Sequence, residues 1–261
     1  MNFNIDNISA VLFDLDGTVY YGSRIIPGAN ETISYFRDRG KAVFFTTNNS
    51  TKTRKQIYEK LLSIGVDCKY DEVITSGYLA AVYAKSMDMK NIYIFGSENL
   101  IEEFENMGVK VSSEENAENL LIGYNPEMTY EGLTGALQVA LHAKQIIACN
   151  KERVFPGENR RPMPGCGAMT APIEWCTHRD CDLVIGKPNT FIVDYLIDNY
   201  KHKRDRILVI GDTYETDIAM ANRAGCRSIL ISKQVIPDEI TVDSIGHIPA
   251  LFEKQGRTFA H

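Results

Sequence analysis

The sequence lacks a long hydrophobic run, an excess of basic charge and any internal repeat. No segment approaches the ~18 consecutive apolar residues of a membrane-spanning helix. The chain has 28 Lys and Arg against 34 Asp and Glu, a formal net charge of −6. We therefore expect no electrostatic attraction to a nucleic acid polymer or an anionic membrane. Solenoid and propeller folds are excluded because no segment recurs.

Cysteine is also scarce, and its spacing is irregular. The six cysteines of the 261 residues form no disulfide framework, and the apolar run 10–13 is too short for a signal peptide. A reducing cytoplasm is the expected location. Cys176, His178 and Cys181 come nearest to a zinc pattern, but their spacing matches no usual structural site and a fourth ligand is missing. We interpret them as packing and surface residues.

What is present is an alternation of apolar strands and amphipathic helices. Continuous apolar runs suit parallel strands that are covered on both faces, and glycines mark helix ends at Gly40 and Gly65. The expected strands are 10–13, 42–45, 92–95, 120–122, 146–148, 183–185, 207–210 and 228–231. The expected helices are 31–39, 52–64, 131–143, 191–200 and 216–224. This order predicts an α/β protein with a Rossmann-like parallel-sheet core (1–80 and 183–261) and an inserted α/β domain (81–182).

The most informative motif is Asp14-Leu15-Asp16-Gly17-Thr18, directly after the first strand. Carboxyl ends of parallel strands open onto the ligand crevice. The spacing of two predicts that Asp14 and Asp16 project to the same side while Leu15 points into the core, so that one carboxylate attacks and the other moves protons. Gly17 permits a tight turn. The alternative is a strand-to-turn junction in which Asp and Gly only form the turn.

Polar groups also follow the second strand. Thr47, Asn48 and Asn49 offer hydroxyl and amide groups that hold phosphate oxygens without adding charge. The alternative is a helix cap at Ser50 or Thr51, and both roles can coexist because a helix N-terminus favours anions.

Two further strand ends carry charge. Lys187, in Gly-Lys-Pro after the strand at 182–185, is expected to pair with Asp14 and with a substrate phosphate, although an isolated lysine is usually a solvated surface group. Asp212 and Asp217 follow the strand 207–210. Several carboxylates at one sheet edge repel unless a cation lies among them, and oxygen ligands select a hard ion such as Mg²⁺. Asp14 then becomes a plausible nucleophile.

These motifs closely resemble those of the haloacid dehalogenase (HAD) superfamily, in the order DLDGT, TNN, GKP and GDTYETD. The NagD-like and p-nitrophenylphosphatase branch is further indicated by YYG (20–22), IPG (26–28), TNNSTKTR (47–54), IFGS (94–97) and PGCGA (164–168). The resemblance implies that Asp14 is the nucleophile, that Asp16 is the general acid and base, and that Asp217 orients the water of the metal. Thr47 would bind the phosphoryl group and Lys187 would stabilise the intermediate. The implied Mg²⁺ ligands are Asp14, Asp212 and, through its backbone carbonyl, Asp16.

The resemblance also implies a large C2-type cap, which matches the insertion expected at 81–182. Many relatives carry Asp where Asn125 stands here, so Asn125 is a candidate substrate-binding residue. The loop 153–164, with Arg160 and Arg161, is a second candidate. Pyridoxal phosphatase carries a histidine where Phe155 precedes Pro156, so pyridoxal phosphate is not favoured.

The expected function is a Mg²⁺-dependent phosphatase that hydrolyses small phosphomonoesters, such as a nucleotide monophosphate or a sugar phosphate, through an aspartyl-phosphate on Asp14. Two alternatives stay open: a phosphotransferase such as a phosphomutase, and a non-catalytic sensor of a phosphorylated ligand. A dinucleotide-binding dehydrogenase is discounted because no glycine-rich turn follows the first strand. The expected partners are a small phosphorylated metabolite and a second copy of the chain, bound through the cap.

Overall fold

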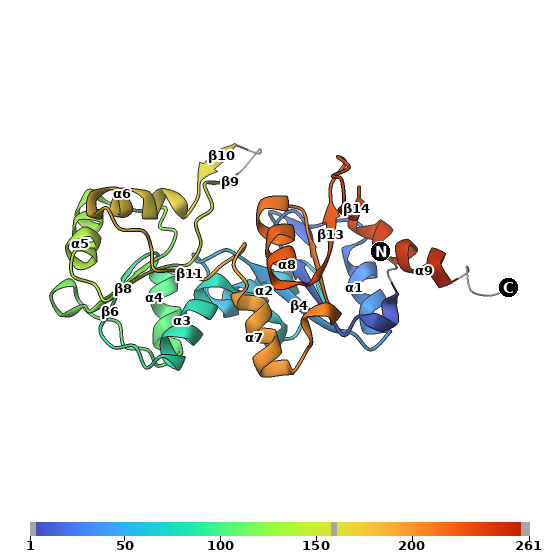
Figure 1. Ribbon diagram of the computed structural model, residues 1–261, viewed down its shortest axis with the longest axis horizontal. Helices are drawn as coiled ribbons and strands as arrows, with labels where there is room; N and C mark the ends of the chain where they lie inside the picture. The colour runs from blue at the N-terminus through green and yellow to red at the C-terminus, as the bar shows by residue number, and fades with distance from the viewer. Residues whose placement is uncertain (1–3, 158–160, 257–261) are drawn as a thin grey trace. The chain divides into compact units, whose positions relative to one another are not determined.

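The computed structural model describes residues 4–157 and 161–256 (Figure 1). The chain divides into two compact units. The first unit contains the residues up to Thr47, Tyr58–Ile74 and the residues from Lys187 onward. The second unit contains Asn48–Ile57 and Thr75–Gly186. The second unit therefore takes in 48–57 and 75–80, ahead of the expected insertion, and 183–186 behind it.

The first unit is built on a six-stranded sheet in the order β14-β13-β12-β1-β4-β5. β1 pairs in parallel with β4 and β12, and β13 pairs in parallel with β12 and β14. The strands are β1 (Ala10–Asp14), β4 (Ala42–Thr47), β5 (Val73–Thr75), β12 (Ile207–Gly211), β13 (Arg227–Ile231) and β14 (Thr241–Val242). The central strands β1 and β12 are buried throughout, as their continuous apolar runs predict.

Helices accompany this sheet, and a small hairpin follows β1. The helices are α1 (Ala29–Arg37), α2 (Arg54–Ser63), α7 (Phe191–Tyr200), α8 (Ala219–Ala224) and α9 (Ile248–Gly256), and the hairpin is β2 (Tyr20–Tyr21) with β3 (Arg24–Ile25). α1 packs on β4 and α8 packs on β13. Phe13 contacts the rings of Phe36 and Phe45, so the same aromatic cluster joins β1, α1 and β4. The predicted α/β class with a parallel sheet is confirmed.

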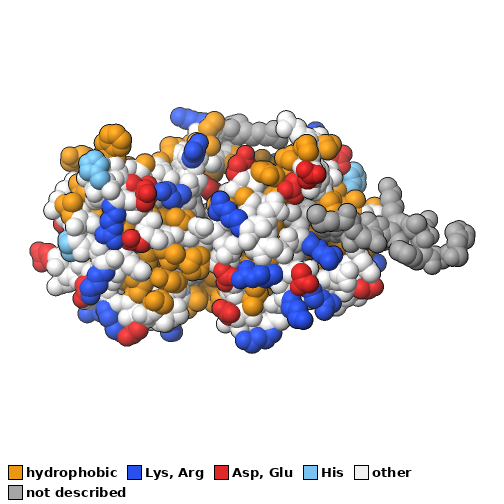
Figure 2. All heavy atoms as spheres, in the orientation of Figure 1, with side chains coloured by type: hydrophobic (Ala, Val, Ile, Leu, Met, Phe, Trp, Pro, Cys, Tyr) orange, Lys and Arg blue, Asp and Glu red, His pale blue; other side chains and the backbone are white. Residues whose placement is uncertain are grey.

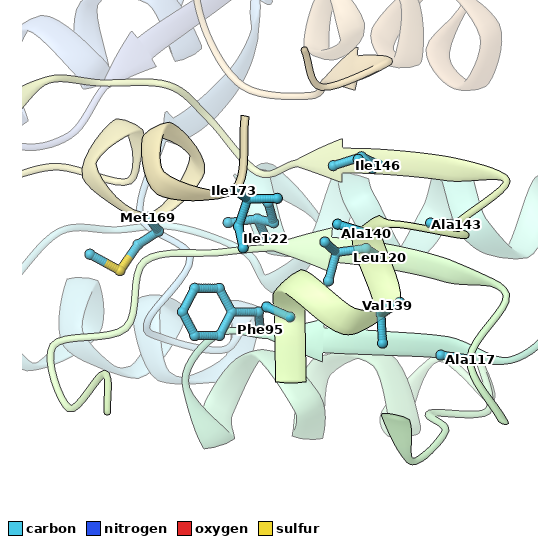
Figure 3. Close-up of a cluster of buried hydrophobic side chains, with 11 residues drawn as sticks. Phe95, Ala117, Leu120, Ile122, Val139, Ala140, Ala143, Ile146, Met169 and Ile173 are labelled. Carbon is cyan, nitrogen blue, oxygen red and sulfur yellow. The ribbon is translucent and has the colours of Figure 1, made fainter. Parts of the chain in front are cut away.

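The second unit has its own parallel sheet in the order β11-β8-β7-β6. The strands are β6 (Ile92–Phe95), β7 (Asn119–Ile122), β8 (Gln145–Ala148) and β11 (Leu183–Val184), and the helices are α3 (Ser76–Ser86), α4 (Glu98–Asn106), α5 (Tyr130–Ala140) and α6 (Gly167–Thr177). An antiparallel hairpin joins β9 (Val154–Pro156) to β10 (Pro162–Pro164). In the hydrophobic core of the second unit, α5 and α6 pack against the four-stranded sheet, and Leu120, Ile122 and Val139 are fully buried (Figure 3).

Two expectations about local structure are corrected. The strand expected at 183–185 does not join the first sheet: Leu183 and Val184 pair with Ile147 and Ala148 of β8. So short an apolar run does not indicate which of the two sheets the strand joins. The helix expected at 216–224 begins instead as a π-helical turn over Tyr214–Ile218 and becomes α-helical at Ala219.

The face displayed in Figure 2 carries no dominant charge. Figure 2 shows basic and acidic side chains interspersed on the displayed face. Within the described ranges, none of the helices combines the length and the apolar character that a membrane span requires.

Candidate active site

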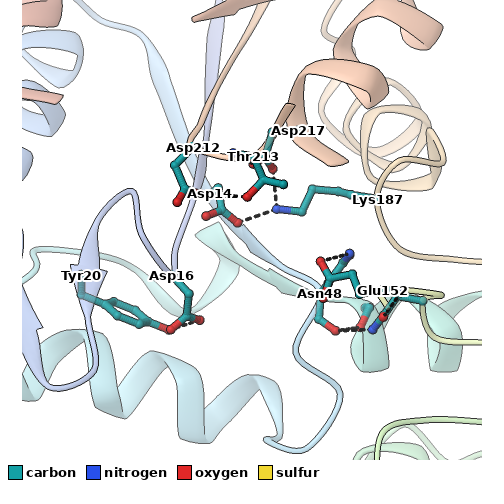
Figure 4. A network of polar contacts seen from close by, with 11 residues as sticks. Asp14, Asp16, Tyr20, Asn48, Glu152, Lys187, Asp212, Thr213 and Asp217 are labelled. Carbon is teal, nitrogen blue, oxygen red and sulfur yellow. Dashed lines mark hydrogen bonds and ion pairs between the residues drawn. The ribbon is translucent and has the colours of Figure 1, made fainter. Parts of the chain in front are cut away.

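Three aspartates meet at the carboxyl end of the first sheet (Figure 4). Asp14 is the last residue of β1, and Asp212 follows the last residue of β12, its parallel neighbour. Asp217 lies in the π-helical turn after β12 and is buried. One carboxylate oxygen from each residue lies within 4.8 Å of the others. The convergence of these three predicted site residues follows from the parallel pairing of β1 with β12.

Lys187 lies between two of these carboxylates. Its ammonium group donates to Asp14 Oδ1 at 2.5 Å and to Asp217 Oδ1 at 2.6 Å. The lysine side chain is only 4% exposed. Asp217 is held from a second side, because the backbone N–H of Thr213 donates to its Oδ2 at 3.2 Å. The interpretation of Lys187 as a solvated surface lysine is therefore wrong.

Burial and mutual repulsion control the ionisation of the cluster. Burial raises the pKa of Asp14 well above its usual value, and the neighbouring carboxylates of Asp217 and Asp212 add to this, whereas Lys187 opposes it. Burial, together with Asp217, raises the pKa of Asp212 to about 6. For Lys187 burial lowers the pKa, but the attraction of Asp14 and Asp217 outweighs it and the net shift is upward. The site therefore favours a bound cation when all its carboxylates are ionised.

Two glycines of the motifs make room for the carboxylates. Gly17 has a φ of +95°, and a Cβ added there would lie 2.1 Å from Oδ2 of Asp212. A Cβ at Gly211 would lie 2.3 Å from the carboxylate carbon of Asp217. The turn at Gly17 was expected from the sequence, but the close approach of a carboxylate to each glycine was not. No sequence pattern identifies these contacts, because they depend on how the chain packs after β1 and β12 end.

Asp16 lies apart from the three-carboxylate cluster. Its side chain is exposed and accepts a hydrogen bond from the hydroxyl of Tyr20 at 3.1 Å. Figure 4 shows Asp16 directed toward Tyr20, whereas Asp14 is directed toward Lys187. The alternation of a strand does not continue to Asp16, because β1 ends at Asp14, and the Asp16 side chain turns toward Tyr20.

The polar residues after β4 have different surroundings. Thr47 is buried at the end of β4, beside Thr46, which pairs with Asp14. Asn48 belongs to the second unit, where its amide donates to Glu152 Oε1 at 3.0 Å and its backbone carbonyl accepts from Asn150 at 2.7 Å. The contribution of Glu152 was not foreseen, since it lies 104 residues away in the chain.

Asn49 makes the local contacts of a turn. Its side-chain oxygen accepts from the backbone N–H groups of Thr51 and Lys52, at 2.8 and 3.1 Å. The hydroxyl of Ser50, which was considered as a helix cap, accepts instead from the backbone N–H of Tyr124 at 3.0 Å.

The remaining candidates lie in the second unit. The side-chain oxygen of Asn125 accepts from the backbone N–H of Glu127 at 3.0 Å, which is the contact of a turn residue. Arg161 is exposed at the hairpin, and Arg160 lies outside the described residues. Among the described residues, the three aspartates are the only group of three or more potential metal ligands whose atoms lie close together, and Cys176, His178 and Cys181 form no such group.

Comparison with known proteins agrees with this geometry. Residues 11–110 match the model of the haloacid dehalogenase-like hydrolases, and residues 184–243 match a HAD-hydrolase-like model. Phosphoglycolate phosphatase 2 of Arabidopsis thaliana is 31% identical, over 91% of this chain and 87% of its own. Sugar-phosphatase AraL of Bacillus subtilis is 30% identical, over 94% of both chains.

The fold comparison gives the same result. The crystal structure of a 4-nitrophenylphosphatase from Thermotoga maritima superposes with a TM-score of 0.88 at 28% identity, over 95% of this chain and 98% of the other. The chain therefore belongs to the haloacid dehalogenase-like phosphatases, in the branch of the NagD-like and p-nitrophenyl phosphatases.

Proposed function

We propose that this protein is a Mg²⁺-dependent phosphatase that hydrolyses small phosphomonoesters through a covalent aspartyl-phosphate on Asp14. The observation that carries the proposal is the position of Asp14, which is buried at a strand end and paired with Lys187 beside two further carboxylates. A carboxylate in this setting is shielded from bulk water, and the lysine offsets its repulsion of an anionic ester.

The donor set fits a small, hard cation. Oxygens bound to one Mg²⁺ at about 2.0–2.1 Å lie at most about 4.2 Å apart. The three carboxylate oxygens lie within 4.8 Å of one another, so Asp14 and Asp212 would need to move by only a few tenths of an ångström to bind the same ion. Asp14, Asp212 and the backbone carbonyl of Asp16 would hold the ion, and Asp217 would orient its water. When bound, the ion neutralises the phosphoryl oxygens and aligns them for displacement.

Side chains of this protein would carry out both chemical steps, the formation of the aspartyl-phosphate and its hydrolysis. In the first, the Asp14 carboxylate attacks phosphorus, the bond to the leaving oxygen breaks, and Asp16 gives that oxygen a proton. In the second, Asp16 removes a proton from water as this attacks phosphorus, and inorganic phosphate leaves Asp14. Lys187 and the Thr47 hydroxyl would bind the phosphoryl group through both steps. Asn48 and Asn49 would shape the loop that follows Thr47.

The substrate class is proposed from the relatives. Those compared above are named for phosphoglycolate, for sugar phosphates and for 4-nitrophenyl phosphate, all of which are small phosphomonoesters. A phosphate-release screen over these compounds, nucleotide monophosphates and pyridoxal phosphate would rank them by kcat/KM. Asn125 and Arg161 are the proposed cap residues that read the leaving group.

The mechanism is tested with the Asp14→Asn variant and with metal removal. The amide matches the carboxylate in shape but is not a competent nucleophile, so turnover should vanish while the circular dichroism spectrum is unchanged. Asp38→Asn, at an exposed aspartate beyond α1, is the matched control and should retain full activity. Chelation should abolish wild-type activity, and Mg²⁺ should restore it. Normal turnover by Asp14→Asn, or full activity in metal-stripped enzyme, would refute the proposal.

Two further proposals concern the cellular location and the oligomeric state of the protein. A cytoplasmic location is supported by the six cysteines, all of which are free thiols. A homodimer formed through the second unit is supported by the exposed rings of Tyr130 and Trp175 on α5 and α6. Light scattering at micromolar concentration would distinguish a dimer from a monomer.

A further inference from the structure

Tyr20 and Asp16 form a pair that the three-carboxylate cluster does not include. The Tyr20 hydroxyl donates to Asp16 Oδ2 at 3.1 Å, and the tyrosine is only 1% exposed although the aspartate is exposed. Tyrosine is a large side chain that usually finds a hydrogen-bond partner when buried. Here the partner is a carboxylate at the surface, so a fixed donor holds a side chain that would otherwise turn freely in solvent.

The backbone between the two residues supports this contact. The N–H groups of Val19 and Tyr20 both donate to the carbonyl of Leu15, at 2.9 and 3.1 Å. The N–H of Gly17 donates to the carbonyl of Tyr20 at 2.9 Å. These hydrogen bonds close a tight turn over residues 15–20, and the turn places the tyrosine ring beside Asp16.

The ring itself is held by a second element. The ammonium group of Lys60, on α2, lies 3.6 Å from the centre of the Tyr20 ring. The Tyr20 hydroxyl is the donor in its contact with Asp16, because an ionised carboxylate can only accept a hydrogen bond.

We propose that Tyr20 is a positioning residue that holds the carboxylate of Asp16 for proton transfer to and from the reacting oxygens. The proposal rests on the function proposed above, in which Asp16 is the general acid and base. Because the hydroxyl binds Oδ2, it restricts the rotation of the side chain and leaves Oδ1 available for proton transfer. General acid and base catalysis depends on this kind of placement.

The test is the leaving-group dependence of Tyr20→Phe, which removes only the hydroxyl and keeps the ring beside Lys60. 4-Nitrophenol leaves without protonation, whereas the alcohol of a sugar phosphate needs the acid. We expect kcat/KM to fall about 10- to 100-fold for a sugar phosphate, a part of the usual contribution of acid–base catalysis, and less than about threefold for 4-nitrophenyl phosphate. Rapid quenching with 4-nitrophenyl phosphate should also show phosphoenzyme accumulating, because its hydrolysis needs the base.

Two controls show whether Tyr20 acts through Asp16. Tyr21→Phe, at the exposed neighbour in the same hairpin, should leave both rates unchanged. In an Asp16→Asn background, Tyr20→Phe should have no further effect on the sugar phosphate, since the group that it positions is already inactive.

The outcomes separate this inference from the mechanism on which it rests. An equal loss with both substrates, no loss with either, or additive effects of Tyr20→Phe and Asp16→Asn would overturn the role of Tyr20. Failure to trap any phosphoenzyme in the wild type, with Asp14→Asn still active, would overturn the covalent mechanism whatever the Tyr20 variant does.

Discussion

Replacing Lys187 by methionine removes the ammonium group that pairs with two of the clustered carboxylates. Methionine keeps much of the length and volume of the lysine side chain, so the change is mainly one of charge. In the metal-free protein, Asp14 and Asp217 lose the ammonium group that lies 2.5 and 2.6 Å away. We expect the first unit to lose stability, and to lose more of it at high pH than at low pH.

The magnitude follows from the geometry. Two ionised carboxylates 4.8 Å apart repel by about 3.5 kcal/mol at an effective dielectric constant of 20, and the cluster contains three such pairs. Removing one partner of a buried ion pair typically costs about 3–5 kcal/mol. The cost is limited because Asp14 and Asp212, whose pKa values are already raised in the wild type, take up protons, so their pKa values in the folded variant rise further above the unfolded value of about 3.9. Between these two pKa values the folded state binds more protons than the unfolded state, and stability falls as pH rises. The loss should therefore approach 3–5 kcal/mol at pH 8 and be clearly smaller at pH 5.5.

The assay must report on the first unit. The single tryptophan, Trp175, lies on α6 of the second unit, so its fluorescence follows the wrong part of the chain. Urea unfolding followed by far-ultraviolet circular dichroism, together with hydrogen exchange of the β1 amides, gives the required free energy. Lys151→Met is the matched control, because Lys151 pairs with Glu174 at 2.7 Å but is 39% exposed. It should cost less than about 1 kcal/mol at either pH.

The refuting result is a loss of equal size at pH 5.5 and pH 8. Such a result would mean that the variant loses packing and that repulsion among the carboxylates contributes little. Mg²⁺ supplies a second check, because a divalent cation replaces the missing charge. It should stabilise Lys187→Met more than the wild type.

Four more predictions follow from individual contacts. Mg²⁺ should stabilise the wild type less at pH 5.5 than at pH 8, because the raised pKa of Asp212, about 6, lets protons compete for the site; equal thermal shifts would contradict this. Gly211→Ala should raise the Mg²⁺ concentration for half-maximal activity at least about tenfold, since its Cβ would displace the Asp217 carboxylate, while Gly132→Ala in α5, with a contact no closer than 3.4 Å, should not. Glu152→Ala should destabilise the second unit by about 1–2 kcal/mol, measured by hydrogen exchange of the β7 and β8 amides, and Glu152→Gln, which keeps an acceptor for Asn48, should cost less; an equal cost would assign the effect to packing. Asn125→Asp should lower kcat/KM selectively for substrates with a second negative charge, and a uniform change would remove Asn125 from the specificity site.

Local sequence patterns predicted the central strands and part of the site. The apolar runs at 10–13, 42–45 and 207–210 predicted β1, β4 and β12, because a parallel strand covered on both faces needs apolar residues at consecutive positions. The motifs at the ends of β1 and β12 then predicted that Asp14 and Asp212 would meet, since parallel neighbours end at the same edge. These inferences need only local pattern and the geometry of one sheet.

Other contacts of the site depend on how distant segments of the chain pack together. Lys187 reaches Asp14 across 173 residues of chain, from a segment that follows a strand of the other sheet. Asp16 turns to Tyr20 because the chain leaves the strand geometry after Asp14, and Gly211 must be glycine because a carboxylate packs against its Cα. Periodicity reports which way a side chain faces within one element. It carries no information about which distant group fills the space beside that side chain, because that depends on the packing of the elements against one another.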